Sequence, residues 1–209
     1  MIKIILADDH PIIITGMRDY IDQMPGYMVV ATASSTDELL ARLKDTRCDM
    51  LIMEFSMPIN RIGDGNALLA MIKRKYPSVS VIVLTMNVMP TVLYQIICSG
   101  VKGLLHKSDE ITEISNAIQD VSHNLQYVGK SVRQLLKKGP SGKLPTRSEA
   151  EVLRMYIVGH SLHEIAKRLN KSVKTVGLQK ASAMKKMGFQ NDIELGRYSS
   201  TISSLSGHA

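Results

Sequence analysis

Short apolar runs alternate with amphipathic stretches over the first 121 residues of the chain. The runs are rich in β-branched side chains, which is typical of strands buried on both faces of a parallel sheet. The stretches between them repeat their apolar residues at helical spacing. Five strands alternating with about five helices predict an α/β fold with a doubly wound parallel sheet. The strand-like runs are IKIILAD (2–8), YMVVATA (27–33), MLIMEF (50–55), VSVIVLTM (79–86) and VKGLLHK (101–107), and the helix-like stretches span 37–44, 65–76, 90–99 and 110–124.

The region 144–209 has helical patterns only. Thr146 and Glu149 have the spacing of a capping box, and Gly159 follows as a stop signal. A second helical stretch, SLHEIAKRLN, precedes Ser172, which is placed to cap a third helix. Two short helices joined by a turn of three to four residues predict a helix-turn-helix. The residues expected to face inward are Leu162, Ile165, Ala166 and Leu169 in the first helix of this pair, and Val173, Val176, Met184 and Met187 in the second.

A basic segment, 122–143, connects the two patterned regions. It contains Lys and Arg but no Asp or Glu, and its GPSG at 139–142 favours turns and a flexible backbone. Acidic residues outnumber basic ones in 1–121, whereas basic residues prevail afterwards, and the whole chain carries a net charge of +7. We therefore expect two domains, 1–121 and 144–209, joined by a basic flexible linker. The basic half would suit a polyanion, although basic residues that merely solubilise a surface give the same composition.

Several classes of protein are disfavoured by the composition. No apolar run approaches the length of a membrane span, and the opening MIKIILADDH has an acidic pair where an export signal has small residues. The two cysteines, Cys48 and Cys98, stand apart in apolar surroundings and are expected to pack as small hydrophobic side chains. These features predict a cytoplasmic protein with reduced thiols.

Polar residues follow the predicted strands at the points where the strands end. Because the carboxyl ends of parallel strands share one edge of a sheet, where ligands of such folds bind, we expect these side chains to converge. Paired acids beside a third carboxylate suit Mg²⁺, with Asp9 as a direct ligand, Asp8 acting through water and the backbone oxygen of Ser56. The converging residues are Asp8 and Asp9 after the first strand, Glu54 at the end of the third, Thr85 at the end of the fourth and Lys107 after the fifth. Lys107 is placed to neutralise excess negative charge, and Thr85 is placed to hydrogen-bond a phosphoryl oxygen.

The motifs in both halves resemble those of one protein family. The phrases ADDHPI, FSMP, GDG and VIVLTMN resemble a receiver domain of bacterial two-component systems. The phrases SEAEVLRMY, EIAKRLNKSVKTV, MKKMG and NDIEL resemble the LuxR-type helix-turn-helix of the NarL/FixJ response regulators. The resemblance implies a flavodoxin-like (βα)5 receiver before an all-α DNA-binding domain. It also implies a transcription regulator rather than an enzyme, working as a dimer on double-stranded DNA.

The chain departs from the family pattern at its phosphorylation site. In this family the third strand ends in the aspartate that accepts a phosphoryl group, and here it ends in Glu54; Ile59 and Ser108 replace a glycine and a proline nearby. Three outcomes stay open: Glu54 imitates the phosphorylated aspartate, is inert, or is phosphorylated slowly. A cognate histidine kinase is therefore doubtful. The acid pair and Lys107 either bind Mg²⁺ or persist as a structural charge cluster in which Lys107 is salt-bridged to Glu54.

The resemblance assigns DNA contact to the outward face of the second helix in the pair. Gln179 suits adenine, Leu178 suits a thymine methyl group, and the lysines suit phosphate. Gly177, Leu178 and Ala181 stand where the family commonly has polar or basic side chains, which puts sequence preference in doubt. The predicted DNA-binding residues are Lys174, Thr175, Leu178, Gln179, Lys180, Ser182, Lys185 and Lys186.

The segment NDIELGRYSSTI resembles the last helix of this domain class, through which two copies usually pair. Ile193, Leu195 and Tyr198 would supply the contact, unless they pack within the monomer. The function we expect is a DNA-binding regulator that acts independently of phosphorylation, as a homodimer or with a related regulator. Its rival is an adaptor that captures a normal regulator in a heterodimer and binds DNA weakly alone.

Overall fold

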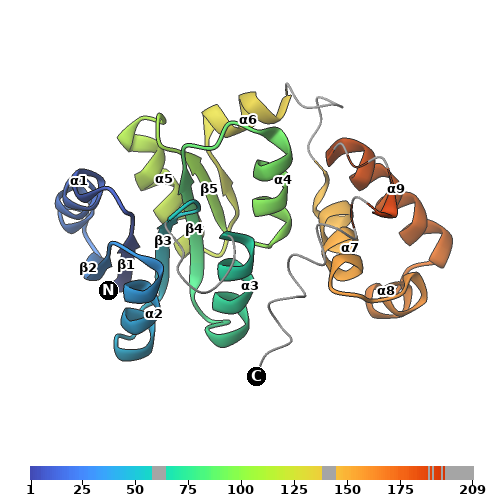
Figure 1. Ribbon diagram of the computed structural model, residues 1–209, viewed down its shortest axis with the longest axis horizontal. Coiled ribbons are helices and arrows are strands. Elements are labelled where there is room, and N and C mark those ends of the chain that lie inside the picture. The colour runs from blue at the N-terminus through green and yellow to red at the C-terminus, as the bar shows by residue number, and fades with distance from the viewer. Residues whose placement is uncertain (58–64, 138–144, 188, 190, 194, 196–209) are drawn as a thin grey trace. The chain divides into compact units, whose positions relative to one another are not determined.

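The computed structural model describes residues 1–57, 65–137, 145–187, 189, 191–193 and 195 (Figure 1). The chain forms two compact units. The first unit comprises 1–86 and 101–131, and the second comprises 87–100 and the chain from Val132 onward.

The first unit contains a six-stranded sheet in which every pair of neighbouring strands is parallel. The spatial order is β2-β1-β3-β4-β5-β6, so the first, third, fourth and fifth strands lie side by side. The five strands expected from the sequence are confirmed, and a sixth extends the sheet beside β5. The bounds are β1 (Ile2–Ala7), β2 (Tyr27–Ala33), β3 (Met50–Glu54), β4 (Ser80–Thr85), β5 (Gly103–His106) and β6 (Tyr127–Val128).

Helices cover the faces of this sheet (Figure 1). One face packs against α1 and α5, where Met17 and Ile21 of α1 join Ile114 and Ile118 of α5 in a single buried cluster. Alternate strand residues are buried toward that cluster, and their neighbours are buried as well, which explains the continuous apolar runs in the sequence. The helices of the first unit are α1 (Pro11–Asp22), α2 (Thr36–Asp45), α3 (Gly65–Lys75) and α5 (Ile111–Ser122).

The segment 122–143 is more ordered than the sequence led us to expect. It contains β6 and the helix α6 (Lys130–Lys137), in which Val132 and Leu136 are buried. The backbone N–H of Ser131 donates to the Asp109 carboxylate at 3.0 Å. A uniformly flexible linker over this segment is therefore wrong for 127–137. Residues 138–144, which include the turn-prone 139–142, lie outside the described residues.

The second unit contains α4 (Pro90–Cys98), α7 (Arg147–Ile157), α8 (Leu162–Leu169) and α9 (Val173–Met187). The predicted capping box at the start of α7 is present, with the Thr146 side chain accepting from Glu149 N–H. Gly159 follows α7 with a φ of 101°, a conformation that glycine adopts without steric cost. Local sequence rules thus set both ends of this helix.

Helices α8 and α9 form the predicted helix-turn-helix. They are joined by residues 170–172, where Asn170 adopts a left-handed φ of 52° and Ser172 Oγ accepts from Thr175 N–H at 3.0 Å. Val152, Ile165, Ala166 and Val176 form the core that holds the helices together. Within the described part of the chain, no helix is long and apolar enough to cross a membrane.

Candidate functional site

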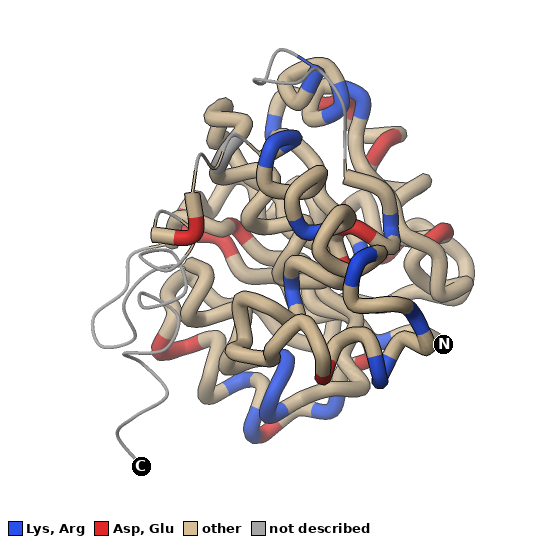
Figure 2. The backbone as a smooth tube through the Cα atoms, turned by 90° about the vertical axis from the view of Figure 1, so that its right-hand side faces the viewer, with Lys and Arg blue, Asp and Glu red and all other residues tan. Residues whose placement is uncertain are grey.

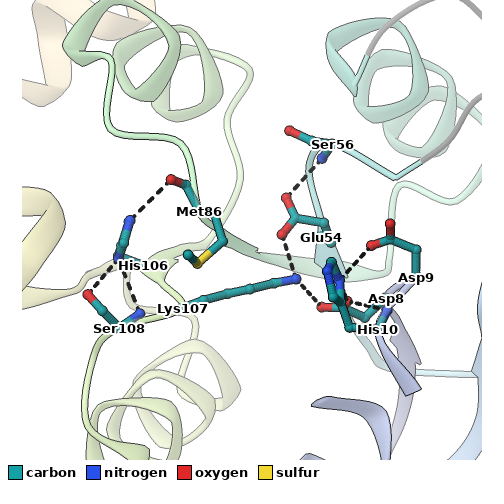
Figure 3. Close-up of polar contacts among 9 residues, drawn as sticks. All are labelled: Asp8, Asp9, His10, Glu54, Ser56, Met86, His106, Lys107 and Ser108. Carbon is teal, nitrogen blue, oxygen red and sulfur yellow. Dashed lines mark hydrogen bonds and ion pairs between the residues drawn. The ribbon is translucent and has the colours of Figure 1, made fainter. Parts of the chain in front are cut away.

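Charged side chains meet at the carboxyl edge of the parallel sheet (Figure 3). Asp8 directly follows β1, Glu54 is the last residue of β3, and Lys107 directly follows β5. Their convergence was predicted because the carboxyl ends of parallel strands share one edge of a sheet, and the structure confirms that Lys107 contacts both acids. We call Asp8, Glu54 and Lys107 the rim cluster.

The ammonium group of Lys107 links the two carboxylates of the rim cluster. Its Nζ lies 2.7 Å from Asp8 Oδ2 and 2.8 Å from Glu54 Oε2, and the side chains of all three residues are at most 6% exposed. Burial by itself would lower the pKa of Lys107, but the two adjacent carboxylates outweigh it and raise that pKa above its usual value. Lys107 is therefore a cation at neutral pH.

Backbone groups bind the remaining oxygens of these carboxylates. Ser56 N–H donates to Glu54 Oε1 at 2.9 Å, and His10 N–H donates to Asp8 Oδ1 at 2.9 Å. Each of the two carboxylates is thus bound through both of its oxygens. The salt bridge expected for a structural charge cluster is present. Ser56, which we predicted as a metal ligand through its carbonyl oxygen, contacts the cluster through its N–H.

Asp9 and His10 extend the cluster toward solvent. His10 Nδ1 lies 3.0 Å from Asp8 Oδ1 and 3.0 Å from Asp9 Oδ1, and the Asp9 side chain is 30% exposed. Three carboxylates against one ammonium group leave an excess of negative charge here. Hard carboxylate oxygens with excess negative charge are what Mg²⁺ prefers, so the donor set fits this ion.

Thr85 lies at the same edge of the sheet. It is the last residue of β4 and is fully buried, and its carbonyl oxygen accepts from Lys107 N–H at 2.9 Å. This backbone bond fixes the start of the segment that carries the Lys107 side chain. The contact between the Thr85 hydroxyl and a phosphoryl oxygen stays a prediction.

His106 is a site neighbour that the sequence reasoning did not single out. The ring is buried, with Nδ1 2.7 Å from Ser108 Oγ and Nε2 3.3 Å from the carbonyl oxygen of Met86. Ser108 N–H donates to Nδ1 at 3.2 Å, so Nδ1 is an acceptor and Nε2 carries the proton. The histidine thereby ties the ends of β4 and β5 together beside Lys107. A proline at 108 would lack this N–H, and the histidine inside an apolar run was the only available signal.

The outward face of α9 is smaller than predicted. Lys174, Thr175, Leu178 and Lys185 are exposed, but Ser182 and Lys186 lie toward α7. The Ser182 hydroxyl donates to Glu149 Oε1 at 2.6 Å, and Lys186 Nζ lies 2.6 Å from Glu149 Oε2. The predicted outward orientation of Ser182 is therefore wrong, and the ammonium group of Lys186, which we predicted to contact phosphate, is held by Glu149. Lys and Arg positions are spread along the backbone, with acidic positions interspersed (Figure 2).

Glu149 is the acceptor that holds this side of α9. Burial raises the pKa of its carboxyl group, but hydrogen bonds from Lys186, Ser182 and Thr146 outweigh burial and bring that pKa down to about 2. Glu149 thus takes part in the capping box of α7 and also binds Ser182 and Lys186 in the C-terminal half of α9.

Two other residues predicted to bind DNA have partners inside the domain. Lys180 Nζ lies 2.6 Å from Asp192 and 3.8 Å from the centre of the Tyr156 ring. Gln179 Oε1 accepts from Lys171 Nζ at 3.1 Å. Contact of Lys180 or Gln179 with DNA would require these interactions to be exchanged.

The predicted pairing residues divide between the interior and the surface. Leu195 is 1% exposed and packs within the monomer, so its assignment to a pairing surface is wrong. Ile193 is 68% exposed and stays a candidate. Tyr198 lies outside the described residues.

Comparison with known proteins decides the family. The model for the response regulator receiver domain matches residues 4–119, and the model for the bacterial regulatory proteins of the luxR family matches residues 145–199.

The chain is a response regulator of the LuxR family.

Among its relatives, the transcriptional regulatory protein RcsB of Salmonella typhi is 38% identical over 204 residues, which cover 96% of this chain and 94% of that protein. A solved structure of RcsB from Salmonella enterica serovar Typhimurium, bound to a promoter in the presence of the phosphomimetic BeF₃⁻, is similar with a TM-score of 0.66 and 38% identity. That match covers 97% of this chain and all of that chain. A structure of two RcsB dimers on two parallel DNAs also has a TM-score of 0.66 and 38% identity, with 96% and 98% covered.

Proposed function

We propose that this response regulator is a DNA-binding transcription regulator whose receiver works without phosphorylation. The observation that carries the second part is the ion pair of 2.8 Å between Glu54 and Lys107. DNA binding is supported by the luxR-family match and by the RcsB structures on DNA. RcsB dimers on DNA likewise favour a dimer as the working form.

Glu54 is poorly suited to accept a phosphoryl group. A glutamate carries its carboxylate about 1.5 Å further from the backbone than an aspartate, and such a misplacement can slow a reaction by about 10²-fold. Both Glu54 oxygens are also bound, one by Ser56 N–H and the other by Lys107. An attacking oxygen would have to leave one of these donors, which adds to the barrier.

The rim cluster instead binds its lysine without a phosphoryl group. The Glu54 carboxylate holds the Lys107 ammonium group without any added anion. Asp8 and Asp9 would hold Mg²⁺ if it binds, and the ion would neutralise their charge. A carboxylate has fewer acceptor oxygens and less charge than a phosphate, so any imitation of phosphorylation is partial.

Treatment with acetyl phosphate and Mg²⁺, followed by a phosphate-binding gel, tests the proposal. We expect no shift for the wild-type chain and for the control Glu54→Gln. Glu54→Asp restores the shorter acceptor and is expected to shift. A Mg²⁺-dependent shift of the wild-type chain that is lost in Glu54→Gln would overturn the proposal.

A second candidate function is favoured by the contacts of α9. Lys180 and Lys186 are engaged by Asp192 and Glu149, so fewer lysines face outward to bind phosphate. An adaptor that pairs with a related response regulator would need less DNA affinity of its own. A gel shift with the purified chain, alone and with such a regulator, separates the two. Binding only in the mixture would favour the adaptor.

A further inference from the structure

We infer that α9 recognises duplex DNA chiefly through the C5-methyl groups of pyrimidines, and that Leu178 makes this contact. The inference rests on the proposed DNA-binding function. Its ligand class is a duplex that presents thymine, or the equivalent 5-methylcytosine, in the major groove.

Leu178 lies within an exposed stripe of α9, which we call the outward stripe. It consists of Lys174, Leu178, Ala181 and Lys185, at helical spacing. The Leu178 side chain is 65% exposed, although α9 buries Val176, Met184 and Met187 elsewhere around its axis. A single exposed leucine is ordinary on a protein surface. This one lies on the second helix of a helix-turn-helix, the element that enters the major groove, so its exposure places an apolar group at the base edges.

Cations flank this apolar position at helical spacing. Lys174 and Lys185 are exposed and lie one turn before and two turns after Leu178 on the same stripe, and exposed Ala181 lies between. Gly177, next to Leu178, has open space where a Cβ would be. Small residues beside a leucine allow close approach to the groove floor, while the terminal lysines suit phosphates.

The polar neighbours that would compete for base contact are engaged within the domain. Gln179 Oε1 accepts from Lys171 at 3.1 Å, so bidentate pairing with adenine would break that bond. The Thr175 hydroxyl lies 2.8 Å from Ser172 Oγ at the helix start. The Ser182 hydroxyl donates to Glu149. Apolar contact by Leu178 is therefore the base contact that α9 can make without breaking these hydrogen bonds.

The chemistry of the ligand follows from one methyl group. In the major groove thymine presents a C5-methyl that uracil and cytosine lack, and 5-methylcytosine presents the same group. Burial of one such group is worth about a fourfold difference in affinity. Replacing thymine by uracil removes the methyl and leaves the base-pairing groups in place.

The experiment selects duplexes from a random pool with the full-length wild-type chain, then remakes the selected duplexes with uracil for thymine. We expect binding about fourfold weaker for each contacted thymine. Leu178→Ala should bind the two versions equally. In a further duplex, a contacted uracil–adenine pair is changed to a cytosine–guanine pair. Methylating that cytosine at C5 should restore part of the affinity for the wild-type chain only.

Two control variants sharpen the result. Leu125→Ala removes an exposed leucine of the first unit and should keep the full preference for thymine. Lys174→Ala should weaken both versions by the same factor.

Failure of the wild-type chain to select any duplex would sink the proposed function. Selection followed by equal affinity for both versions would sink this inference alone, as would a thymine preference that persists in Leu178→Ala. The comparison of the two duplexes on the wild-type chain needs no variant to fold.

Discussion

The rim cluster and the outward stripe of α9 differ in burial and in where their side chains find partners. At the rim, Asp8, Glu54 and Lys107 are almost completely buried, and each finds its partner inside the chain. On α9, Lys174, Leu178 and Lys185 are exposed. The contrast shows where the partners lie: the buried charges at the rim pair within the chain, whereas the stripe presents cations and an apolar group to solvent.

The cost of burying charge explains the difference. A buried carboxylate without a partner is strongly unfavourable, so three buried charges persist only because they pair with each other. Exposed lysines have water as a partner and keep their capacity to bind phosphate. The buried charges at the rim are therefore held by partners within the chain, whereas the exposed side chains of α9 are available to a second molecule.

Removing Lys107 should have the largest effect on stability, because it takes away the partner of both buried carboxylates at the rim. Lys107→Met leaves two buried carboxylates side by side, and we expect the free energy of unfolding of the first unit to fall by about 3 kcal/mol. Urea denaturation with hydrogen exchange of the β1, β3 and β5 peptides measures it. The exposed Lys44→Met is the matched control, and an equal loss in both variants would contradict the role of the rim cluster.

Glu149→Gln should produce the next largest effect, in the second unit. The carboxylate caps α7 and binds Lys186, so we expect a loss of about 2 kcal/mol, seen as faster hydrogen exchange in α7 and α9. Glu151→Gln, on the same helix, is the control.

The low pKa of Glu149 also predicts a pH dependence. Its folded pKa of about 2 lies below the ordinary 4.5, so its contribution is complete above about pH 4.5 and is lost as the pH falls toward 2. The wild-type chain should lose protection of α7 and α9 over this window more steeply than Glu149→Gln. Parallel curves for the two proteins would show that this carboxylate is not responsible.

Gly177→Ala should stabilise the second unit. A Cβ at this position meets open space, and alanine is about 1 kcal/mol better than glycine inside a helix. Thermal unfolding or exchange of the α9 peptides measures the gain. Gly159→Ala is a contrasting control, because the positive φ at Gly159 makes an alanine strained there. Destabilisation by Gly177→Ala would mean that the glycine is required for a conformation other than the helix.

The smallest effects concern single phosphate contacts. Lys174→Ala should reduce the steepness of the plot of log affinity against log salt by about 1, without loss of stability. Lys186→Ala should mainly destabilise the domain, because its ammonium group is held by Glu149. Titration of both variants with one duplex at several salt concentrations separates these outcomes. An unchanged salt slope in Lys174→Ala would remove this lysine from the DNA-binding surface.

Local rules predicted the helix ends well. The capping box of Thr146 and Glu149, the stop at Gly159 and the cap at Ser172 are confirmed, because each depends on residues within one turn of the chain. Strand β6 was missed because its two residues, Tyr127 and Val128, are too short to show a period.

The sequence by itself determined the alternating α/β order, the helix-turn-helix and the meeting of Asp8, Glu54 and Lys107, because strand ends in a parallel sheet share an edge whatever their loops do. Only the tertiary structure decided which partner each polar side chain takes: Ser182 and Lys186 turn to Glu149, and Leu195 turns inward. A long side chain can reach partners over several ångströms, so helical spacing gives its direction but not its contact. That choice depends on which neighbour the packing brings within hydrogen-bond distance.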